Sequence, residues 1–518
     1  MGNVRSKLGE MLHTAIKEGR KDDALDLLKS GVHVDIFFEN KSVIYAAVLH
    51  RQYDVLEYVL QHKEVNMEDG YYTETPLHCA CKNSDLKAVE MLIAAGAKVN
   101  AVDQNNCTPL WLAVDAGKRD IVDFLLNESH MKVDLNTPCK DRFMAKDARC
   151  TPINKAAEMD NTEIVRILAN HGADVNFPNN HGRVALHHAC YSGNKEMVEI
   201  LLNCHCDVDL VEEDGISPFY VACKHNHHEI VNLLIAQGCD VNKPRSDSGW
   251  HCRGFSPLHV ATQYHQTKAV RALLAAGADV NQGDFRDVQP VALACEEGQI
   301  EILNLLLQYK ADVNHKDKKG CVALAYCFEF SYPNEILKRL LQEHVDVNVR
   351  MFDQEPILHF SVRQLSVEIP SLLVNNGAKL NILDKRELNA LYYSINMGKI
   401  ATSSLLLVHG ARITEYELEN ALTSLKITYK LIEVILEIIN MDMIRNVLPK
   451  FESHHKEICD LVKNVLCQPS SLKRLCRDVI RGTINKKTSR SILPLIQAIK
   501  LPDIVVSYLT CQIHLHPI

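Results

Sequence analysis

The sequence has no apolar run long enough to cross a membrane and no secretory signal. Its longest strongly apolar stretch, residues 492–506, is interrupted by Gln497, Lys500 and Asp503, so it is too short and too polar to span a bilayer. The first ten residues, MGNVRSKLGE, lack the apolar core that a secretory signal needs. We therefore expect a cytoplasmic or nuclear protein whose 18 cysteines carry reduced thiols and form no disulfide framework.

An excess of basic residues is also absent. The chain has 57 lysines and arginines against 65 aspartates and glutamates, a net charge of -8, whereas a general nucleic-acid binder needs surplus cations to neutralise phosphate. The sequence contains no glycine-rich phosphate loop, no nucleophile elbow and no HExxH metal motif. It therefore predicts a protein that is not an enzyme, needs no cofactor or metal, and does not bind nucleic acid.

A repeat of about 33 residues runs through most of the chain. The motif TPLH, which starts at Thr75, has eleven further copies, and seven of the eleven spacings between successive copies equal 33 residues. Such regularity predicts stacked structural repeats. The other copies begin at Glu10, Ser42, Thr108, Thr151, Val184, Ser217, Ser256, Gln289, Val322, Pro356 and Asn389. A second motif, typified by GADVN, keeps the same register and ends at Asn100, Asn176, Asn242, Asn281 and Asn381.

Each repeat predicts two short helices and a turn. In the fifth copy, a Thr-Pro pair at 151–152 has the form of an N-cap followed by a proline that starts a helix. Alanines at 156–157 give this helix a small face, and the apolar residues within 164–168 form the stripe of a second helix. Gly172 supplies the left-handed position that ends the second helix, and residues 174–176 begin an extended hairpin.

These residues resemble the ankyrin repeat family, whose period and TPLHxA signature they match over residues 7–414. The resemblance implies an all-α fold, an ankyrin-repeat solenoid of about twelve helix-turn-helix repeats with β-hairpin loops, in which neighbours stack into one continuous core. Two spacings exceed the period and predict insertions at 134–150 and 243–254 in the hairpin loops.

Most residues of the repeats are expected to stack the solenoid. Four cysteines occupy the slot of a small buried alanine and three histidines end the TPLH motif, so we expect both sets to be structural. They are Cys81, Cys190, Cys223 and Cys295, and His78, His187 and His259. The densest group of metal-type side chains shows no recognised pair of zinc-ligand pairs and predicts no metal site. It consists of Cys204, His205, Cys206, Cys223, His227 and His228.

The period is lost after residue 414. Residues 415–467 predict a helical linker or cap, residues 468–509 a separate small helical domain, and residues 510–518 a tail. A proline and a serine start a short helix in this domain, and its apolar residues recur at helical spacing. These apolar residues are Leu472, Leu475, Cys476, Val479 and Ile480.

Residues 468–509 resemble a SOCS box, and an ankyrin array followed by one resembles the ankyrin repeat and SOCS box family. Ser471, Leu472, Cys476 and Ile480 match each term of the family's elongin C-binding element. The spacing i, i+4, i+8 places the last three on one face of a helix that can lie in an apolar groove. The alternative is an ordinary amphipathic core helix.

A second SOCS-box element resembles the family's cullin box. It implies binding to cullin-5 and through it to a RING subunit. The matching residues are Ile496, Ile499, Leu501, Pro502, Val505, Tyr508 and Leu509. Lys500 stands where the family has its first proline, which weakens the prediction for cullin more than the prediction for elongin.

The family resemblance implies a substrate-receptor subunit of an elongin BC–cullin–RING ubiquitin ligase. The ankyrin repeats would bind an unknown protein target, and the SOCS box would bind elongin C, with elongin B, and cullin-5. The alternative is a ligase-independent ankyrin scaffold, in which the C-terminal helices only cap the stack.

Both insertions are basic in an acidic protein, and they are predicted to contact an acidic protein target. The second insertion holds one of only two tryptophans, a residue type that often anchors interfaces. The candidate target-binding residues are Arg142, Arg149, Trp250 and Arg253. The alternative is that both insertions are tolerated, mobile loops.

The N-terminal sequence MGNVRS fits the N-myristoylation pattern at Gly2. One acyl chain would give only marginal, reversible membrane attachment, and a chance match is the alternative.

Overall fold

The computed structural model describes residues 2–33, 36–62, 74–128, 131–140, 149–245, 254–328, 333–351, 354–363 and 366–422. These residues belong to two compact units. Unit 1 comprises Met1–Leu293 and Glu301–Ala311, and unit 2 comprises Ala294–Ile300 and Asp312–Ile518. The boundary falls within α17 (Pro290–Glu296) and at the first residue of α18 (Ile300–Gln308).

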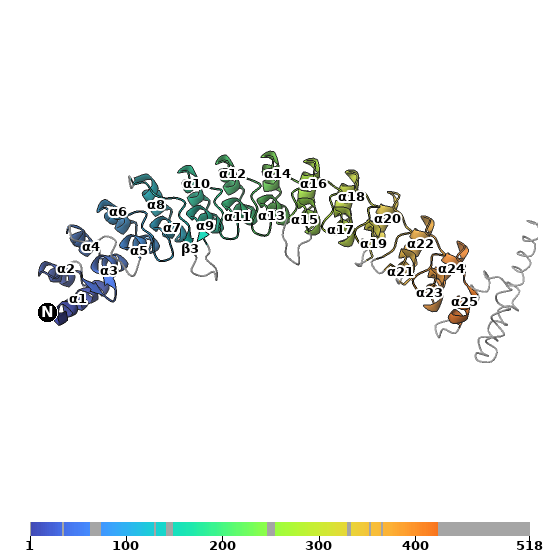
Figure 1. Ribbon diagram of the computed structural model, residues 1–518, viewed down its shortest axis with the longest axis horizontal. Coiled ribbons are helices and arrows are strands. Elements are labelled where there is room, and N and C mark those ends of the chain that lie inside the picture. The colour runs from blue at the N-terminus through green and yellow to red at the C-terminus, as the bar shows by residue number, and fades with distance from the viewer. Residues whose placement is uncertain are drawn as a thin grey trace, which may run out of the picture. The chain divides into compact units, whose positions relative to one another are not determined.

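Unit 1 is built from helix pairs, one pair for each repeat. The first helices pack side by side in one layer and the second helices in another (Figure 1). The first helices are α1 (Gly2–Lys17), α3 (Val43–Leu49), α5 (Pro76–Lys82), α7 (Pro109–Asp115), α9 (Pro152–Glu158), α11 (Ala185–Ser192), α13 (Pro218–Lys224) and α15 (Pro257–Gln263). The second helices are α2 (Lys21–Lys29), α4 (Tyr53–Leu60), α6 (Leu86–Ala94), α8 (Arg119–Asp123) with the π-helical turn η1 (Phe124–Glu128), α10 (Thr162–Asn170), α12 (Lys195–Asn203), α14 (His228–Ala236) and α16 (Thr267–Ala275).

Unit 2 follows the same plan. Its first helices are α19 (Ala323–Tyr326), α21 (Ile357–Arg363), α23 (Ala390–Asn396) and α25 (Glu415–Leu422), and its second helices are α20 (Pro333–Leu341), α22 (Glu368–Asn375) and α24 (Ile400–Val408). The helix α23 packs against α21 and α25, and α22 packs against α20 and α24. The predicted helical repeat architecture is therefore confirmed in both units.

The motif TPLH starts helices where the sequence predicts. The hydroxyl of Thr108 accepts a hydrogen bond from the backbone N–H of Trp111 at 3.2 Å, and Ser217 accepts one from Tyr220 at 3.2 Å. The proline that follows such a cap needs no N–H partner, because the first N–H groups of a helix have none within it. Gly172 takes a φ of 85° at the end of α10, as predicted.

The first helix begins before the first copy of the motif. That copy starts at Glu10, whereas α1 begins at Gly2 and runs for 16 residues. No cap-and-proline pair precedes Met11 to set a boundary there, so the helical conformation extends over the preceding turns.

Few of the inter-repeat loops, which join the second helix of one repeat to the first helix of the next, are β-hairpins. In the described part of the chain, strands pair only between β1 (Phe37–Phe38) and β2 (Lys41–Ser42) and between β3 (Cys139–Lys140) and β4 (Arg149–Cys150). Other loops are closed by an aspartate: Oδ1 of Asp103 accepts the N–H groups of Asn105 at 2.8 Å and Cys107 at 2.9 Å. The side chain adds these bonds to a backbone hydrogen bond from the N–H of Asp103 to the carbonyl of Cys107 at 3.0 Å. Among the described residues, the predicted hairpin loops thus contain paired strands only at β1–β2 and β3–β4.

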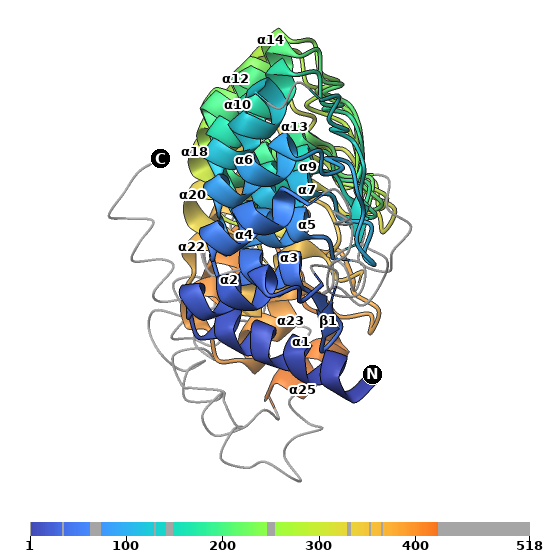
Figure 2. The ribbon, with the colours of Figure 1, turned by 90° about the vertical axis from the view of Figure 1, so that its left-hand side faces the viewer.

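The asparagine that ends the second motif joins successive loops. Oδ1 of Asn176 accepts the N–H of Asp207 at 2.8 Å, and Oδ1 of Asn242 accepts the N–H of Asp279 at 2.8 Å. In unit 1 these loops gather on one side of the helices (Figure 2). These bonds between successive loops explain why the motif keeps one register along the chain.

The histidines that end TPLH join each repeat to the next. Nδ1 of His259 accepts the N–H of Ser256 at 3.2 Å, so Nε2 carries the proton and donates to the carbonyl of Val288 at 2.9 Å. His78 and His187 make the same two kinds of bond, to the carbonyls of Cys107 and Ile216. Their predicted structural role is confirmed, and burial lowers the pKa of each ring.

The cysteines in the alanine slot are core residues, as predicted. Cys81, Cys190, Cys223 and Cys295 are all buried, and burial raises the pKa of the first three thiols. For Cys295, a hydrogen bond with Cys327 raises the pKa first and burial adds to it. Such thiols pack as small apolar groups and are poor nucleophiles. Within the described residues, no helix is both long and apolar enough to span a bilayer.

Candidate functional site

A groove in unit 1 lies where the first insertion meets the first helices of three repeats. Its cavity has a volume of about 400 Å³ and is lined in part by Trp111 of α7; we call it the Trp111 groove. The lining residues come from α5, α7, α9 and the loops beside them. They are Glu74, Lys82, Asp103, Cys107, Trp111, Leu112, Asp115, Cys139, Lys140 and Lys155.

Trp111 holds the returning strand of the insertion. Its indole Nε1 donates to the carbonyl of Cys150 in β4 at 2.9 Å, and the Nζ of Lys155 lies 5.9 Å from the centre of its ring system. Sequence reasoning missed this tryptophan as a site residue and chose Trp250 instead. The available signal was its position, because Trp111 occupies the slot that holds histidine in TPLH.

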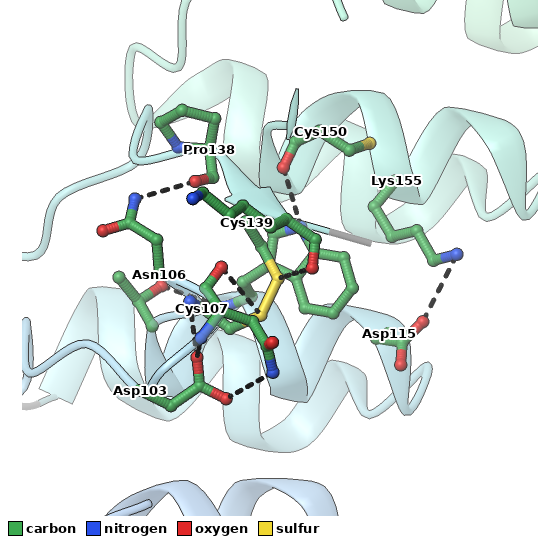
Figure 3. The surroundings of a disulfide bond; sticks show 12 residues. Asp103, Asn106, Cys107, Asp115, Pro138, Cys139, Cys150 and Lys155 are labelled. Carbon is green, nitrogen blue, oxygen red and sulfur yellow. Dashed lines mark hydrogen bonds and ion pairs between the residues drawn. A yellow bond between two sulfur atoms is a disulfide. The ribbon is translucent and has the colours of Figure 1, made fainter. Parts of the chain in front are cut away.

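A disulfide fastens the outgoing strand of the insertion. Cys107 of one loop is joined to Cys139 of β3, and the N–H of Lys140 donates to the carbonyl of Asn105 at 2.7 Å (Figure 3). Nδ2 of Asn106 adds a bond of 2.9 Å to the carbonyl of Pro138. The expectation that all thiols are reduced is therefore wrong for this pair. The repeat stacks loops that are 32 residues apart in sequence, which brings the two cysteines together.

We expect the disulfide to stabilise oxidised protein by about 3.6 kcal/mol, because it closes a loop of roughly 30 residues in the unfolded chain. Cys139→Ser should lower the unfolding midpoint of oxidised protein, whereas Cys150→Ser, which removes a thiol that is in no disulfide from the paired strand, should change it little. Peptide mapping without reductant should find Cys107 linked to Cys139. Two unlinked peptides in protein purified without reductant would contradict the pairing.

Charge in the Trp111 groove is mixed. Lys155 lies 3.4 Å from a carboxylate oxygen of Asp115 and 3.5 Å from one of Glu158, and Lys82 lies 3.4 Å from Glu74. Burial acts to lower the pKa of Lys155, but the two carboxylates outweigh it and raise that pKa. An apolar floor with charged groups at its rim is typical of protein interfaces.

Farther along unit 1, the first helices end in an exposed aromatic ridge, which we define as Tyr191, His225 and Tyr264. Tyr191 is 67% exposed, and its ring centre lies 4.8 Å from that of His225. The Nζ of Lys224 lies 5.4 Å from the ring centre of Tyr264, which is 45% exposed. Exposed aromatic side chains on rigid helices are common anchors for a binding partner. Sequence reasoning missed the ridge, although its members recur near the same position of successive repeats.

The helix α11, which carries Tyr191 of the ridge, also carries His188, whose pKa is lowered. Burial lowers the pKa of His188 to about 4, and the charges of Arg183 and Lys155 add to the effect. In the ranges that the structure describes, no three metal-type side chains are placed to hold an ion.

Most of the sequence-predicted site residues lie outside the described residues. This applies to the elongin-binding residues Ser471, Leu472, Leu475, Cys476 and Ile480, and to the cullin-binding residues Ile496, Leu501, Pro502, Val505, Tyr508 and Leu509. It also applies to the insertion residues Arg142, Trp250 and Arg253. Arg149 is described, exposed, and paired with Lys140 across β3 and β4. Gly2 is the first residue of α1, and its acylation stays a prediction.

Proteins of several kinds share this repeat. Transient receptor potential cation channel subfamily A member 1 of Homo sapiens is 29% identical over 168 residues, which is 32% of this chain and 14% of the channel. Putative ankyrin repeat protein FPV223 of Fowlpox virus (strain NVSL) is 28% identical over 132 residues, 26% of this chain and 85% of that protein. Ankyrin repeat and KH domain-containing protein mask-1 of Caenorhabditis elegans is 28% identical over 123 residues, 23% of this chain and 5% of that protein. The chain thus spans only a small part of the channel, so the likeness concerns the repeats alone.

The family model "Ankyrin repeats (3 copies)", which describes three successive repeats, matches residues 43–139, 134–212, 195–284, 247–317 and 324–417. Such repeats form scaffolds for protein–protein interaction. Because the matches together cover well over half of the chain, the protein belongs to the ankyrin repeat family.

Proposed function

We propose that the protein is the substrate-receptor subunit of an elongin BC–cullin–RING ubiquitin ligase. The observation that carries the proposal is the sequence pattern Ser471, Leu472, Cys476 and Ile480, which matches the elongin C-binding element of a SOCS box. These residues lie outside the described part of the chain, so the support comes from their spacing. Three of them share one face of a predicted helix suited to an apolar groove.

The ankyrin scaffold would hold the target in this assembly. The Trp111 groove offers a cavity of about 400 Å³ with an apolar floor, and the aromatic ridge offers exposed rings at Tyr191 and Tyr264. Both features belong to helices that neighbouring repeats hold in place, so binding a partner requires little further ordering of side chains. Such a surface suits a protein ligand better than a small molecule.

Catalysis would then come from positioning. The receptor ties the target to a scaffold that also carries a charged ubiquitin-conjugating enzyme, which raises the effective concentration of target lysines near the thioester. The residues of this chain would hold no covalent intermediate. The cullin-box match, which includes Leu501 and Pro502, supports cullin-5 as the scaffold, although Lys500 replaces the family's first proline.

Co-expression with elongins B and C tests the proposal. The full-length chain should purify as a stable complex with both elongins, and adding cullin-5 with its RING subunit should give a larger complex on size exclusion. A known SOCS-box receptor serves as the positive control. Failure of the folded chain to bind elongins under conditions where the control binds would favour the ligase-independent scaffold instead.

A further inference from the structure

The inter-repeat loops of unit 2 present pairs of cations at one fixed position of the repeat. In two of these loops an aspartate that closes the loop is followed directly by two basic residues: Asp317 by lysines at 318 and 319, and Asp384 by Lys385 and Arg386. All four basic side chains are exposed. The repetition of the pair in one register means that the cations project from equivalent points of the solenoid.

In the second of these loops the closing aspartate forms no ion pair with Lys385 or Arg386, because its oxygens are bonded within the loop. Oδ1 of Asp384 accepts the N–H groups of Arg386 at 2.8 Å and Leu388 at 3.0 Å, and Oδ2 accepts the hydroxyl of Tyr393 at 2.5 Å. Burial acts to raise the pKa of Asp384, but these hydrogen bonds, led by that of Tyr393, lower it. Asp317 is bonded in the same way to two N–H groups and to a tyrosine hydroxyl.

Unit 1 differs at the same position. The two residues after the closing residue are Gln-Asn at 104–105, Asn-His at 180–181, Glu-Asp at 213–214 and Phe-Arg at 285–286. None of these loops carries a pair of basic residues there, and one carries a pair of acidic residues. The pair of adjacent basic residues is therefore a feature of the two loops at 318–319 and 385–386 and is not a general feature of the repeat.

A small cavity of about 200 Å³ lies beside the second basic pair. Its walls are Glu355, Arg363, Asp384, Lys385, Arg386 and Tyr393. Arg363 pairs with Glu355, and its guanidinium carbon lies 5.6 Å from the ring centre of Tyr393. The side chains of Lys385 and Arg386 have no ion-pair partner among the described residues, so the cavity mouth carries a surplus of positive charge.

Arg350 continues this positive charge toward the neighbouring loop. Its Nη1 donates to the carbonyl of Gln354 at 2.7 Å, and its Nη2 lies 3.5 Å from the carbonyl of Leu383 in the next loop. Both partners are uncharged, and no carboxylate in the described ranges pairs with this guanidinium. The bonds fix its position next to the loop that carries Lys385 without cancelling its charge.

We propose that Arg350, Lys385 and Arg386, together with the neighbouring Arg363 that pairs with Glu355, form a basic edge that binds an acidic segment of a partner protein. The inference rests on the scaffold half of the proposed function and needs no elongin. Charge complementarity selects the partner: the edge is positive on a chain whose net charge is -8. A protein segment fits better than nucleic acid, because ankyrin repeats are scaffolds for protein–protein interaction and a chain of net charge -8 lacks the surplus of cations that a phosphate backbone needs.

Fluorescence anisotropy with the full-length chain tests the basic edge. The probes are fluorescein-labelled peptides of about 15 residues, one of alternating glutamate and serine and one of alternating lysine and serine, with oligo(dT) of similar length as the nucleic-acid arm. The acidic peptide should bind, and raising NaCl from about 0.05 M to about 0.3 M should weaken its binding, since salt screens such contacts. Stronger binding of oligo(dT) than of the acidic peptide would overturn the assignment to a protein segment.

Charge reversal locates the site. Lys385→Glu with Arg386→Glu should weaken binding of the acidic peptide about tenfold or more, because attraction is replaced by repulsion at the cavity mouth. The matched control is Lys379→Glu with Arg412→Glu, which makes the same charge change at exposed positions outside the cavity wall. It should change the affinity by no more than about twofold.

Two checks keep the result interpretable. Both double variants should keep the circular dichroism spectrum and melting midpoint of the wild type, and Lys385→Gln with Arg386→Gln should give an intermediate loss of affinity. Equal losses in the reversal and its control would overturn the proposal, since binding would then follow net charge alone. No binding of the acidic peptide by the wild-type chain would also overturn it, while leaving elongin binding unaffected.

Discussion

Lowering the pH from about 7 to about 5.5 should destabilise the protein by several kcal/mol, well before its carboxylates are protonated. The cause is a set of histidines whose pKa is lowered in the folded chain, mainly by burial: His78, His187, His188, His259 and His359. Each can contribute up to roughly 1 kcal/mol over this interval. The unfolding midpoint, followed by circular dichroism in buffers of equal ionic strength, measures the effect.

The direction follows from proton binding. An unfolded chain binds a proton at histidine near the ordinary pKa of about 6.5, whereas the folded chain binds it more weakly. The stabilisation is therefore complete above that pH and is lost as the pH falls toward the lowered pKa of each ring. Protonation of His259 would place a second N–H against the N–H of Ser256, where the ring now accepts a hydrogen bond. Asp284 partly opposes the shift, because its negative charge raises the pKa of His259.

The chain supplies its own control for this prediction. Asn154 occupies the slot of these histidines in the fifth repeat, and its Nδ2 donates to the carbonyls of Phe177 at 2.8 Å and Arg183 at 3.4 Å. Asparagine thus joins two repeats without a titrating ring. We expect replacement of the three TPLH histidines of unit 1 by asparagine to flatten the pH dependence between about pH 7 and 5.5.

If the triple variant is too unstable to purify, His187→Asn alone should remove the contribution of one histidine to the loss of stability between about pH 7 and 5.5. A midpoint that falls equally with pH in the wild type and in the asparagine variants would show that other groups carry the acid sensitivity. A wild-type midpoint that does not change over this interval would contradict the prediction outright.

Local signals account for what the sequence predicted well. A threonine or serine followed by proline is both a cap and a helix start, so the beginnings of α9 at Pro152 and α13 at Pro218 need no tertiary information. The alanine slot constrains size, which is why Cys190 could be assigned to the core. Where the local signal is weak, as in the first repeat, the motif does not mark the start of the helix, and α1 begins at Gly2.

Contacts that cross an insertion could not be predicted. Trp111 binds the carbonyl of Cys150, 39 residues away, and the path of the chain between them has no repeat to guide it. Cys107 and Cys139 meet only because stacking brings their loops side by side. The unpaired state of Arg350 depends likewise on which carbonyls and carboxylates surround it in space. Such features follow from the register of the stack and not from any one segment.

Leu472→Asp combined with Cys476→Asp should abolish elongin binding while leaving the ankyrin repeats folded. The spacing of these residues places both on the predicted binding face, where an unpaired carboxylate in an apolar groove costs several kcal/mol. Since each 1.4 kcal/mol is tenfold, we expect affinity to fall by about a hundredfold or more. Capture of elongins B and C by the tagged chain, quantified against the wild type, measures the loss.

Arg474→Asp is the matched control, because it makes the same change in net charge on the opposite face of the predicted helix. It should retain most elongin binding, and both variants should keep the melting profile of the ankyrin repeats. The double variant should still bind its targets through the scaffold, and targets that accumulate on it in cells are then candidates for ubiquitination. If a well-folded double variant binds elongins as the wild type does, the segment from Ser471 to Ile480 is an ordinary amphipathic helix, and the ligase proposal loses the observation that carries it.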